Sequence, residues 1–280
     1  YNTGKEVRNY MAYIGFGTWK VPDNSQGDRI IQDAVAAGYR HFDSAERYAN
    51  ESMLGRALRS SGMARQDFTV TGKVWKTHMG YDRTLKACEN SLKMLGFDSF
   101  DCYLIHWPEP ITTNAAYSKN VNSDTWRALE RMHDEGLVKK IGVANFMRRH
   151  LEPLLLKANI KPEINQLEIH PGCIQTDAIA CCREYGIEPE AWSPLGSGDI
   201  LKIPELMDIA DRHDSTTAEV CLNWLLQQNI SPIVRSFHST RMYKNLHGTR
   251  FVLDAEELAT ITAIPQQGDL NGMDPDTFLL

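Results

Sequence analysis

Short apolar runs alternate along the chain with longer stretches whose apolar residues recur at helical spacing. Runs of this length are typical of buried strands, and the stretches between them predict amphipathic helices. We expect strands near residues 13–17, 39–43, 69–73, 100–106, 139–144, 163–168, 187–192 and 231–235. We expect helices near residues 28–37, 52–60, 83–95, 124–135, 148–157, 176–185, 206–213, 217–228 and 255–264. This alternation predicts an α/β fold in which crossover helices join parallel strands.

A single domain is the simplest organisation of the 280 residues, because no linker, repeat or low-complexity tract divides them and 42% are hydrophobic. The net charge of −6 argues against a nucleic acid or an anionic membrane as partner, since both need a concentrated positive surface. No run of about 18 apolar residues could span a bilayer and no secretion signal opens the chain, so we expect a cytoplasmic protein. The first residue is Tyr1 and not Met, so the natural N-terminus need not coincide with the start of this numbering.

Metal binding is not expected. The six cysteines include no CxxC pair and no regular spacing, which favours buried reduced thiols over a zinc site or a disulfide framework. Adjacent Cys181 and Cys182 lie in a helical stretch, where consecutive side chains diverge too far for joint ligation. The nine histidines lack the HExxH spacing of zinc enzymes.

Four reactive side chains lie at or just beyond the ends of three predicted strands. Asp43 and Tyr48 come at the end of the second run, Lys73 closes the third, and His106 closes the fourth. The carboxyl ends of strands in a parallel barrel share one face, so these groups would meet there. A phenol, an ammonium, a carboxylate and an imidazole can together deliver a proton without a nucleophilic Ser or Cys.

The chemistry of this group follows from ordinary pKa values. A free Tyr has a pKa of about 10, but a buried ammonium such as Lys73 would stabilise the tyrosinate and lower the pKa of Tyr48. A buried Lys in turn needs a carboxylate, and Asp43 is suitably placed. His106 could then orient a substrate oxygen. Taken singly, each residue has a structural explanation as a cap, a salt bridge or packing, and it is their combination that indicates a site.

Longer motifs surround these residues. They are GFGTW at 15–19, GYRHFDSAERYANE at 38–51, TGKVW at 71–75, LIHWP at 104–108, IGVANF at 141–146, INQLEIHP at 164–171 and DPD at 274–276. In these motifs, which extend over nearly the whole chain, the sequence resembles the aldo-keto reductase superfamily. Its short loops resemble the prokaryotic branch that includes 2,5-diketogluconate and methylglyoxal reductases. The resemblance implies one (β/α)8 TIM barrel over residues 1–280 and NAD(P)H-dependent reduction of a carbonyl compound.

The usual dinucleotide fingerprint is absent. Patterns that begin at Gly15 and Gly196 resemble the start of GxGxxG, but Lys20 and Leu201 stand where a third glycine is needed. A Rossmann fold is therefore disfavoured, and the coenzyme contacts have to be assigned from the family resemblance.

The resemblance implies coenzyme contacts at both ends of the dinucleotide. Asn145 and Gln166 would hold the nicotinamide carboxamide and Trp192 would stack on the ring, although core packing alone also accounts for a buried Trp. The loop after the eighth strand and the next helix N-terminus would bind the phosphates through free backbone N–H groups. The complete implied set is Thr18, Asp43, Asn145, Gln166, Trp192, Ser193, Leu195, Arg235, Ser236, His238, Arg241 and Asn245.

Some positions depart from the family pattern. Arg235 replaces the usual Lys, Lys244 replaces a usual Glu, and Ala144 replaces a usual Ser. A guanidinium is a planar fork where an ammonium is a point charge, yet the positive charge is kept. We therefore expect NADPH as coenzyme, with NADH as the alternative, and we expect Arg235, Ser236 and Arg241 near the 2′-phosphate and pyrophosphate.

An aromatic mouth is expected around the substrate. Its walls would be Trp19, Tyr48, Trp75, His106 and Trp107, although tryptophans at a barrel top also pack against one another. Residues 108–123 are expected to form a polar loop beside the pocket. Residues 265–280 are expected to form an irregular tail, which in the family shapes substrate selection.

The sequence thus predicts an enzyme that transfers hydride from NADPH to an aldehyde or ketone. Tyr48 would donate the proton, Lys73 and Asp43 would tune the phenol, and His106 would align the carbonyl. We expect a monomer that acts on a small-molecule carbonyl substrate. Two alternatives stay open: a nucleotide-binding regulatory or structural barrel with little turnover, and a lyase or aldolase that uses Lys73 as a Schiff-base amine.

Overall fold

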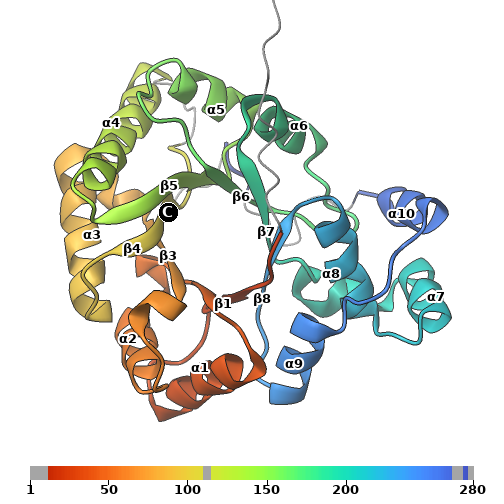
Figure 1. Cartoon of the computed structure of the whole chain (residues 1–280). Coiled ribbons are helices and arrows are strands. Elements are labelled where there is room, and N and C mark those ends of the chain that lie inside the picture. Colours follow the sequence, from red (N-terminus) through yellow and green to blue (C-terminus); the bar gives the residue numbers. More distant parts are fainter. Residues whose placement is uncertain (1–11, 110–114, 267–273, 277–280) are drawn as a thin grey trace, which may run out of the picture.

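Eight parallel strands close into a ring in the computed structural model, which describes residues 12–109, 115–266 and 274–276 (Figure 1). The strands are β1 (Gly15–Gly17), β2 (His41–Asp43), β3 (Thr69–Val74), β4 (Phe100–Ile105), β5 (Val138–Ala144), β6 (Ile164–Glu168), β7 (Glu188–Trp192) and β8 (Ser231–Val234). Each strand pairs with the next along the chain, and β8 returns to β1, where Gly15 lies opposite Ile233. The predicted α/β fold, a single (β/α)8 barrel, is confirmed.

Helices surround the strands on the outside of the ring (Figure 1). They are α1 (Ser25–Ala37), α2 (Glu51–Arg59), α3 (Tyr81–Leu95), α4 (Ala115–Asp134), α5 (Arg148–Leu155), α6 (Thr176–Tyr185), α7 (Pro204–Arg212), α8 (Thr217–Gln227), α9 (Ser239–His247) and α10 (Ala255–Thr262). The two ends of α1 show how a helix begins and ends here. The side chain of Asn24 accepts hydrogen bonds from backbone N–H groups at the start of α1, and Gly38 ends that helix at a φ of 111°, which favours glycine.

The predicted loop over residues 108–123 is wrong in its second half. Helix α4 begins at Ala115, well before the expected start at residue 124. No Pro or Gly lies between Ala115 and Ser123, and the segment opens with two alanines, so nothing stops a helix there. Its polar residues obscured the helical pattern, and residues 110–114 lie outside the described part of the chain.

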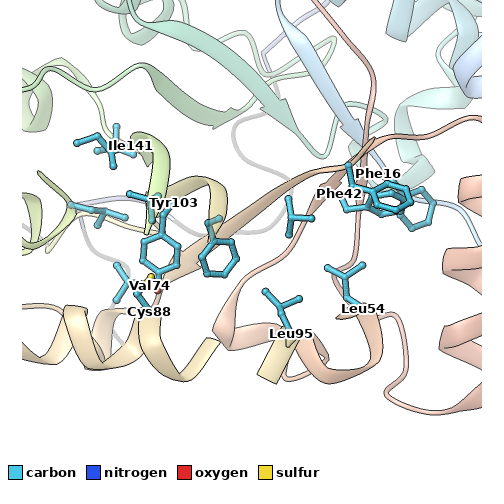
Figure 2. Close-up of a cluster of buried hydrophobic side chains, with 14 of the residues drawn as sticks. Phe16, Phe42, Leu54, Val74, Cys88, Leu95, Tyr103 and Ile141 are labelled. Carbon is cyan, nitrogen blue, oxygen red and sulfur yellow. The ribbon is translucent and has the colours of Figure 1, made fainter. Parts of the chain in front are cut away.

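Apolar side chains fill the space between the strands and the helices. Figure 2 shows one cluster, in which Phe16, Phe42 and Val74 of the strands pack with Leu54 of α2 and Leu95 of α3. A second cluster joins β6 and β7 to α6, α7 and α8. Successive strand residues point to opposite sides, so the residues between these apolar positions face the inside of the barrel. Many of those inward residues are polar.

Helix α2 lies close against the end of α3 because Gly55 has no side chain. A Cβ atom at position 55 would lie 1.9 Å from the carbonyl oxygen of Leu95. This close approach fixes the position of α2. The helix begins three residues after Tyr48, which is the last residue of the 3₁₀ turn Glu46–Tyr48.

Candidate active site

The predicted reactive residues meet at the carboxyl end of the barrel. Asp43 is the last residue of β2, Lys73 lies next to the end of β3, and His106 follows β4 directly. Tyr48 belongs to the 3₁₀ turn after β2. Because β2, β3 and β4 are consecutive neighbours in the ring, their ends bring these four side chains to one place.

Lys73 is the centre of this group and is fully buried. Its Nζ donates to Asp43 Oδ1 at 2.5 Å, to the carbonyl oxygen of Ser44 at 3.1 Å and to Tyr48 Oη at 3.4 Å. An ammonium has three hydrogens, so these acceptors use all of them. Burial opposes the charge of Lys73, but Asp43 and Tyr48 outweigh it and raise the pKa of the ammonium above its ordinary value. Lys73 therefore stays charged at neutral pH.

The ionisation of Tyr48 differs from the expectation. Lys73 does act to lower the pKa of the phenol, but burial raises it by more, so the pKa lies above its ordinary value. The expected net lowering is therefore wrong. Sequence reasoning identified the correct partner and underestimated the desolvation of the phenol. Tyr48 is a protonated donor at neutral pH, with a cation within reach of the oxygen that would become negative.

His106 lies beside Tyr48 as a neutral imidazole. Its pKa is held well below the ordinary value, first by burial and then by the positive charges of Lys73 and Arg47. The ring centroids of Tyr48 and His106 lie 5.6 Å apart in an edge-to-face arrangement. A neutral imidazole keeps one N–H donor, so His106 can hydrogen-bond an oxygen without adding a charge to the site.

The predicted aromatic mouth is assembled from four loops. Trp19 contacts Tyr48 with ring centroids 5.0 Å apart, and Trp75 contacts His106 at 5.1 Å. Trp19 is 45% exposed, whereas Trp75 is buried. The phenol and the imidazole therefore lie between one solvent-exposed indole and one buried indole. Trp107 lies further along and contacts Trp192 at a centroid distance of 6.4 Å. Trp107 therefore connects the mouth to the predicted nicotinamide residues.

The predicted nicotinamide residues are linked to each other and to His106. Asn145 has a φ of 64°, a left-handed conformation that Asn tolerates. Its Oδ1 accepts from Trp192 Nε1 at 2.8 Å, and its Nδ2 donates to the carbonyl oxygen of His106 at 3.0 Å. The indole of Trp192 is thus held in place by a hydrogen bond. Thr18 is buried beside this group and donates to the carbonyl oxygen of Asp43 at 3.0 Å.

Gln166 connects this group to the inside of the barrel. Its Nε2 donates to Asp43 Oδ2 at 2.9 Å and to Glu190 Oε2 at 3.0 Å, which commits both amide hydrogens. Its carbonyl oxygen is left to accept from another group. A carboxamide N–H₂, such as that of nicotinamide, is a donor that fits this oxygen. The residues present therefore fit a nicotinamide coenzyme.

Sequence analysis missed Glu190 and Tyr13. Glu190 lies within β7, is 1% exposed, and accepts a hydrogen bond from the phenol of Tyr13 as well as from Gln166. A charged residue in the interior of the predicted strand 187–192 was the signal that could have identified it, because an unpaired carboxylate is costly to bury. Tyr13 carried no comparable signal.

The predicted phosphate residues lie between β8 and the first turns of α9. Arg235, His238 and Arg241 are exposed there, and Asn245 is buried one turn further along the helix. Arg235 is already engaged, because it donates to the carbonyl oxygen of Trp19 at 2.7 Å and its guanidinium lies 5.2 Å from the ring centroid of Phe237. Ser193 follows β7 at a φ of 52°, and Leu195 lies half-buried beyond it.

Comparison with known proteins agrees with this geometry. The model of the aldo/keto reductase family matches residues 13–266. Glyoxal reductase of Bacillus subtilis (strain 168) is 38% identical over 269 residues, covering 96% of this chain and 94% of its own. Methylglyoxal reductase DkgA of Escherichia coli O157:H7 is 34% identical over 272 residues, covering 96% and 95%. A mutant of Gox0644, solved in complex with NADPH, superposes with a TM-score of 0.87 at 34% identity, covering 95% and 94%.

The fold, the strand-end site and these similarities define an oxidoreductase. The chain belongs to the aldo/keto reductase family. The predictions of a prokaryotic-type aldo-keto reductase, of an NAD(P)H-dependent enzyme and of NADPH as coenzyme are confirmed at the level of the family. Two of the similar proteins are named as reductases of glyoxal and methylglyoxal.

Other predictions are tested only in part. Within the described residues, no helix is both long and apolar enough to cross a membrane. All six cysteines are buried. Of the predicted tail over residues 265–280, residues 267–273 and 277–280 lie outside the described chain. The described part includes Asp276, which forms an ion pair with Arg149 of α5 and has an oxygen 3.1 Å from Nε2 of His150 on the same helix.

Proposed function

We propose that this chain reduces a small aldehyde or ketone with NADPH and that Tyr48 is the proton donor. One observation carries the proposal: the buried ammonium of Lys73 lies between a carboxylate, at 2.5 Å, and the phenol of Tyr48, at 3.4 Å. Bound NADPH would supply a hydride to the carbonyl carbon. The residues of this chain have to handle the negative charge that then develops on the carbonyl oxygen.

Tyr48 would neutralise that oxygen. Because burial raises the pKa of its phenol, Tyr48 holds its proton until an alkoxide forms nearby. The positive charge of Lys73 would then stabilise the tyrosinate, and Asp43 would keep Lys73 charged throughout. Positioned acid catalysis of this kind typically contributes about 10²–10⁴ in rate.

His106 would align the substrate. As a neutral imidazole it can donate one hydrogen bond to the carbonyl oxygen while Tyr48 delivers the proton to the same atom. Trp19 and Trp75 would bound the pocket on either side. We propose dicarbonyls such as methylglyoxal as first substrates, which the names of similar reductases support.

We propose the coenzyme contacts from the same geometry. Trp192 would stack on the nicotinamide, and the free carbonyl oxygen of Gln166 would accept from its carboxamide. Arg241 is exposed near the start of α9, where the helix dipole favours an anion, so it would contact the 2′-phosphate. The remaining proposed contacts are Thr18, Asp43, Asn145, Ser193, Leu195, Arg235, Ser236, His238 and Asn245. The cytoplasmic location and the monomeric state stay predictions from the sequence.

Two measurements test the function. Loss of NADPH absorbance is followed with methylglyoxal, an aromatic aldehyde and a keto-steroid, and NADPH binding is followed separately by quenching of Trp fluorescence. Turnover with at least one carbonyl is the expected result. Binding without any turnover would identify a nucleotide-binding barrel. Trapping of a Lys73 adduct by borohydride, in the absence of NADPH oxidation, would identify a Schiff-base enzyme.

A further inference from the structure

A continuous chain of polar contacts crosses the inside of the barrel and ends at Tyr48. Glu190 of β7 is at its inner end, held by Tyr13 on one oxygen and by Gln166 on the other. Gln166 also donates a hydrogen bond to Asp43. Lys73 donates one hydrogen bond to Asp43 and another to Tyr48. The mechanism derived so far uses the outer part of this chain and leaves Glu190 without a role.

We propose that Glu190 is a positioning residue of the reductase site: through Gln166 it fixes the acceptor that faces the nicotinamide carboxamide, and through Gln166 and Asp43 it influences the charge balance at Lys73 and Tyr48. The proposal rests on the proposed function. Glu190 itself is buried, so in this proposal it acts through Gln166 and Asp43 and not on the substrate directly.

Glu190 helps to fix the orientation of the Gln166 amide. An amide beside the Asp43 carboxylate must direct its nitrogen toward it, because its carbonyl oxygen would be repelled, and Glu190 Oε2 accepts the second amide hydrogen. With both hydrogens engaged, by Asp43 and Glu190, the carbonyl oxygen of Gln166 has only one direction left. Removing Glu190 would leave one hydrogen without its acceptor and the amide free to rotate about its contact with Asp43.

The charge of Glu190 would act on Asp43, Lys73 and Tyr48. The titratable groups that act on Glu190 are Tyr13, Asp43, Lys73 and Cys102. His41 stacks on Tyr13, and the charges of Glu188, Lys140 and Glu163 act on Tyr13 or Cys102 beside Glu190. Burial holds His41 neutral by lowering its pKa to about 4, and it holds the phenol of Tyr13 and the thiol of Cys102 neutral by raising their pKa values well above the ordinary range. Asp43 and Lys73, which contact each other, are the charged groups that act on Glu190 itself, and their effects on its pKa oppose each other.

The ionisation of Glu190 would break this balance. Burial raises the pKa of Glu190 to about 7, although hydrogen bonds from Tyr13 and Gln166 act against the rise. Below that pH the acid is neutral and adds no charge beside the pair of Asp43 and Lys73. Above it, a second carboxylate adds negative charge there and disfavours the tyrosinate that Tyr48 must become. Carbonyl reduction should therefore fall as the pH rises through about 7.

Two variants separate these effects. Glu190→Gln keeps the shape, can accept from Gln166 and donate to Tyr13, and cannot ionise. We expect it to remove the inflection near pH 7 from the profile of kcat/KM while NADPH affinity changes little. Glu190→Leu removes the acceptor as well, and we expect it to weaken NADPH binding by about tenfold, since a buried donor is left unpaired.

Tyr13→Phe is the second line of evidence, should Glu190→Gln not fold. It removes a donor that stabilises the carboxylate, so the inflection should move to higher pH and not disappear. Glu130→Gln is the matched control, because Glu130 is a buried carboxylate that binds the backbone N–H groups of Asn159 and Ile160, away from the site. It should alter stability and leave the pH profile in place.

A readout without turnover distinguishes this inference from the proposed function. The infrared carbonyl band of a protonated, buried carboxylic acid should be present below about pH 7 in the protein alone and titrate away above it. Burial raises the pKa of Glu51 to about 7 as well, so the band of Glu190 is the part that is missing in Glu190→Gln. If the band titrates but no carbonyl is reduced, the proposed function fails and Glu190 still titrates as argued. If the band is absent, or if Glu190→Gln keeps the pH profile and Glu190→Leu keeps the NADPH affinity of the unchanged chain, the role of Glu190 is refuted.

Discussion

Lys73 is the residue on which the proposed acid chemistry depends, since its ammonium contacts both the carboxylate that keeps it charged and the phenol that it serves. Because Lys73 is fully buried, its charge depends on these partners and not on water. A buried cation without a carboxylate would lose its proton, and a buried carboxylate without a cation would gain one. The effects of substituting Lys73 and Tyr48 should therefore differ in kind.

Replacing Tyr48 should affect the reaction and little else. Tyr48→Phe removes only the hydroxyl, so we expect kcat for carbonyl reduction to fall by at least about 10², the low end for a positioned acid. NADPH affinity, measured by fluorescence quenching, should stay within about twofold, since the proposed coenzyme contacts do not use this hydroxyl. Near-normal turnover of Tyr48→Phe would remove Tyr48 from the mechanism.

Replacing Lys73 should affect both the reaction and the fold. Lys73→Met leaves Asp43 buried without its cation, so we expect the free energy of unfolding to fall by about 3–5 kcal/mol in addition to the loss of activity. Stability is measured by urea denaturation and activity by NADPH oxidation.

The double variant Asp43→Asn with Lys73→Met provides the control. It removes both charges, so it should recover much of the lost stability and none of the activity. A double variant that stayed as unstable as Lys73→Met would show that Lys73 supports the fold through packing and not through its charge.

The sequence predicted the identity of these residues better than their ionisation. Asp43, Lys73 and His106 could be located because each ends a recognisable apolar run. The net pKa of Tyr48 could not be predicted, because it depends on how deeply Trp19 and His106 cover the phenol. Glu190 could not be assigned a role either, since its partners Tyr13 and Gln166 come from distant parts of the chain.

The two arginines that follow β8 have different surroundings. Arg235 is held against the carbonyl oxygen of Trp19 and the ring of Phe237, whereas Arg241 is exposed on the first turn of the helix. We expect Arg241→Ala to raise the NADPH dissociation constant about tenfold or more and to leave that of NADH nearly unchanged, because NADH lacks the 2′-phosphate. Titration of both coenzymes measures the difference.

Arg235→Ala is the matched comparison. It removes the same charge but also releases the loop that carries Trp19, so both coenzymes should bind more weakly. The NADPH preference of the unchanged chain should also shrink as salt is added, since the exposed site is screened. Equal losses for both coenzymes in Arg241→Ala would mean that Arg241 does not bind the 2′-phosphate.

The contact between α2 and α3 leads to a prediction about stability. Gly→Ala within a helix is usually stabilising, but a Cβ at position 55 would overlap the carbonyl oxygen of Leu95. We expect Gly55→Ala to lower the free energy of unfolding by about 1–3 kcal/mol and to shift the turn that carries Tyr48. Arg56→Ala, on the exposed face of the same helix, should change stability by less than about 1 kcal/mol. A stabilised Gly55→Ala variant would show that α2 can move away freely.

Elements were predictable where a periodic pattern stood between clear breaks. The strands and most helices meet this condition. The start of α4 did not, because its first turns are largely polar and show no apolar periodicity. The sequence also does not show how closely α2 packs against α3. A glycine in a helix can simply be tolerated there, or it can be required because another backbone packs against it, and the sequence does not distinguish the two cases.

At the scale of the whole molecule, the sequence indicated parallel strands, and the family resemblance was needed to close them into a barrel. Alternation of strands and helices is also compatible with an open sheet. Closure depends on the pairing of β1 with β8, two short strands whose apolar patterns say nothing about each other. The resemblance supplied what periodicity could not.

That pairing has a consequence for how the protein is made. β8 is synthesised after the other seven strands, so the outer edge of β1 has no partner until β8 emerges from the ribosome. Until residue 233 emerges, the growing chain is an open sheet with two unpaired edges, which can pair with other nascent chains. Once Gly15 meets Ile233, none of the eight strands of the described ring has an unpaired edge. Edge-to-edge pairing with other chains is therefore expected before the ring closes and not after it.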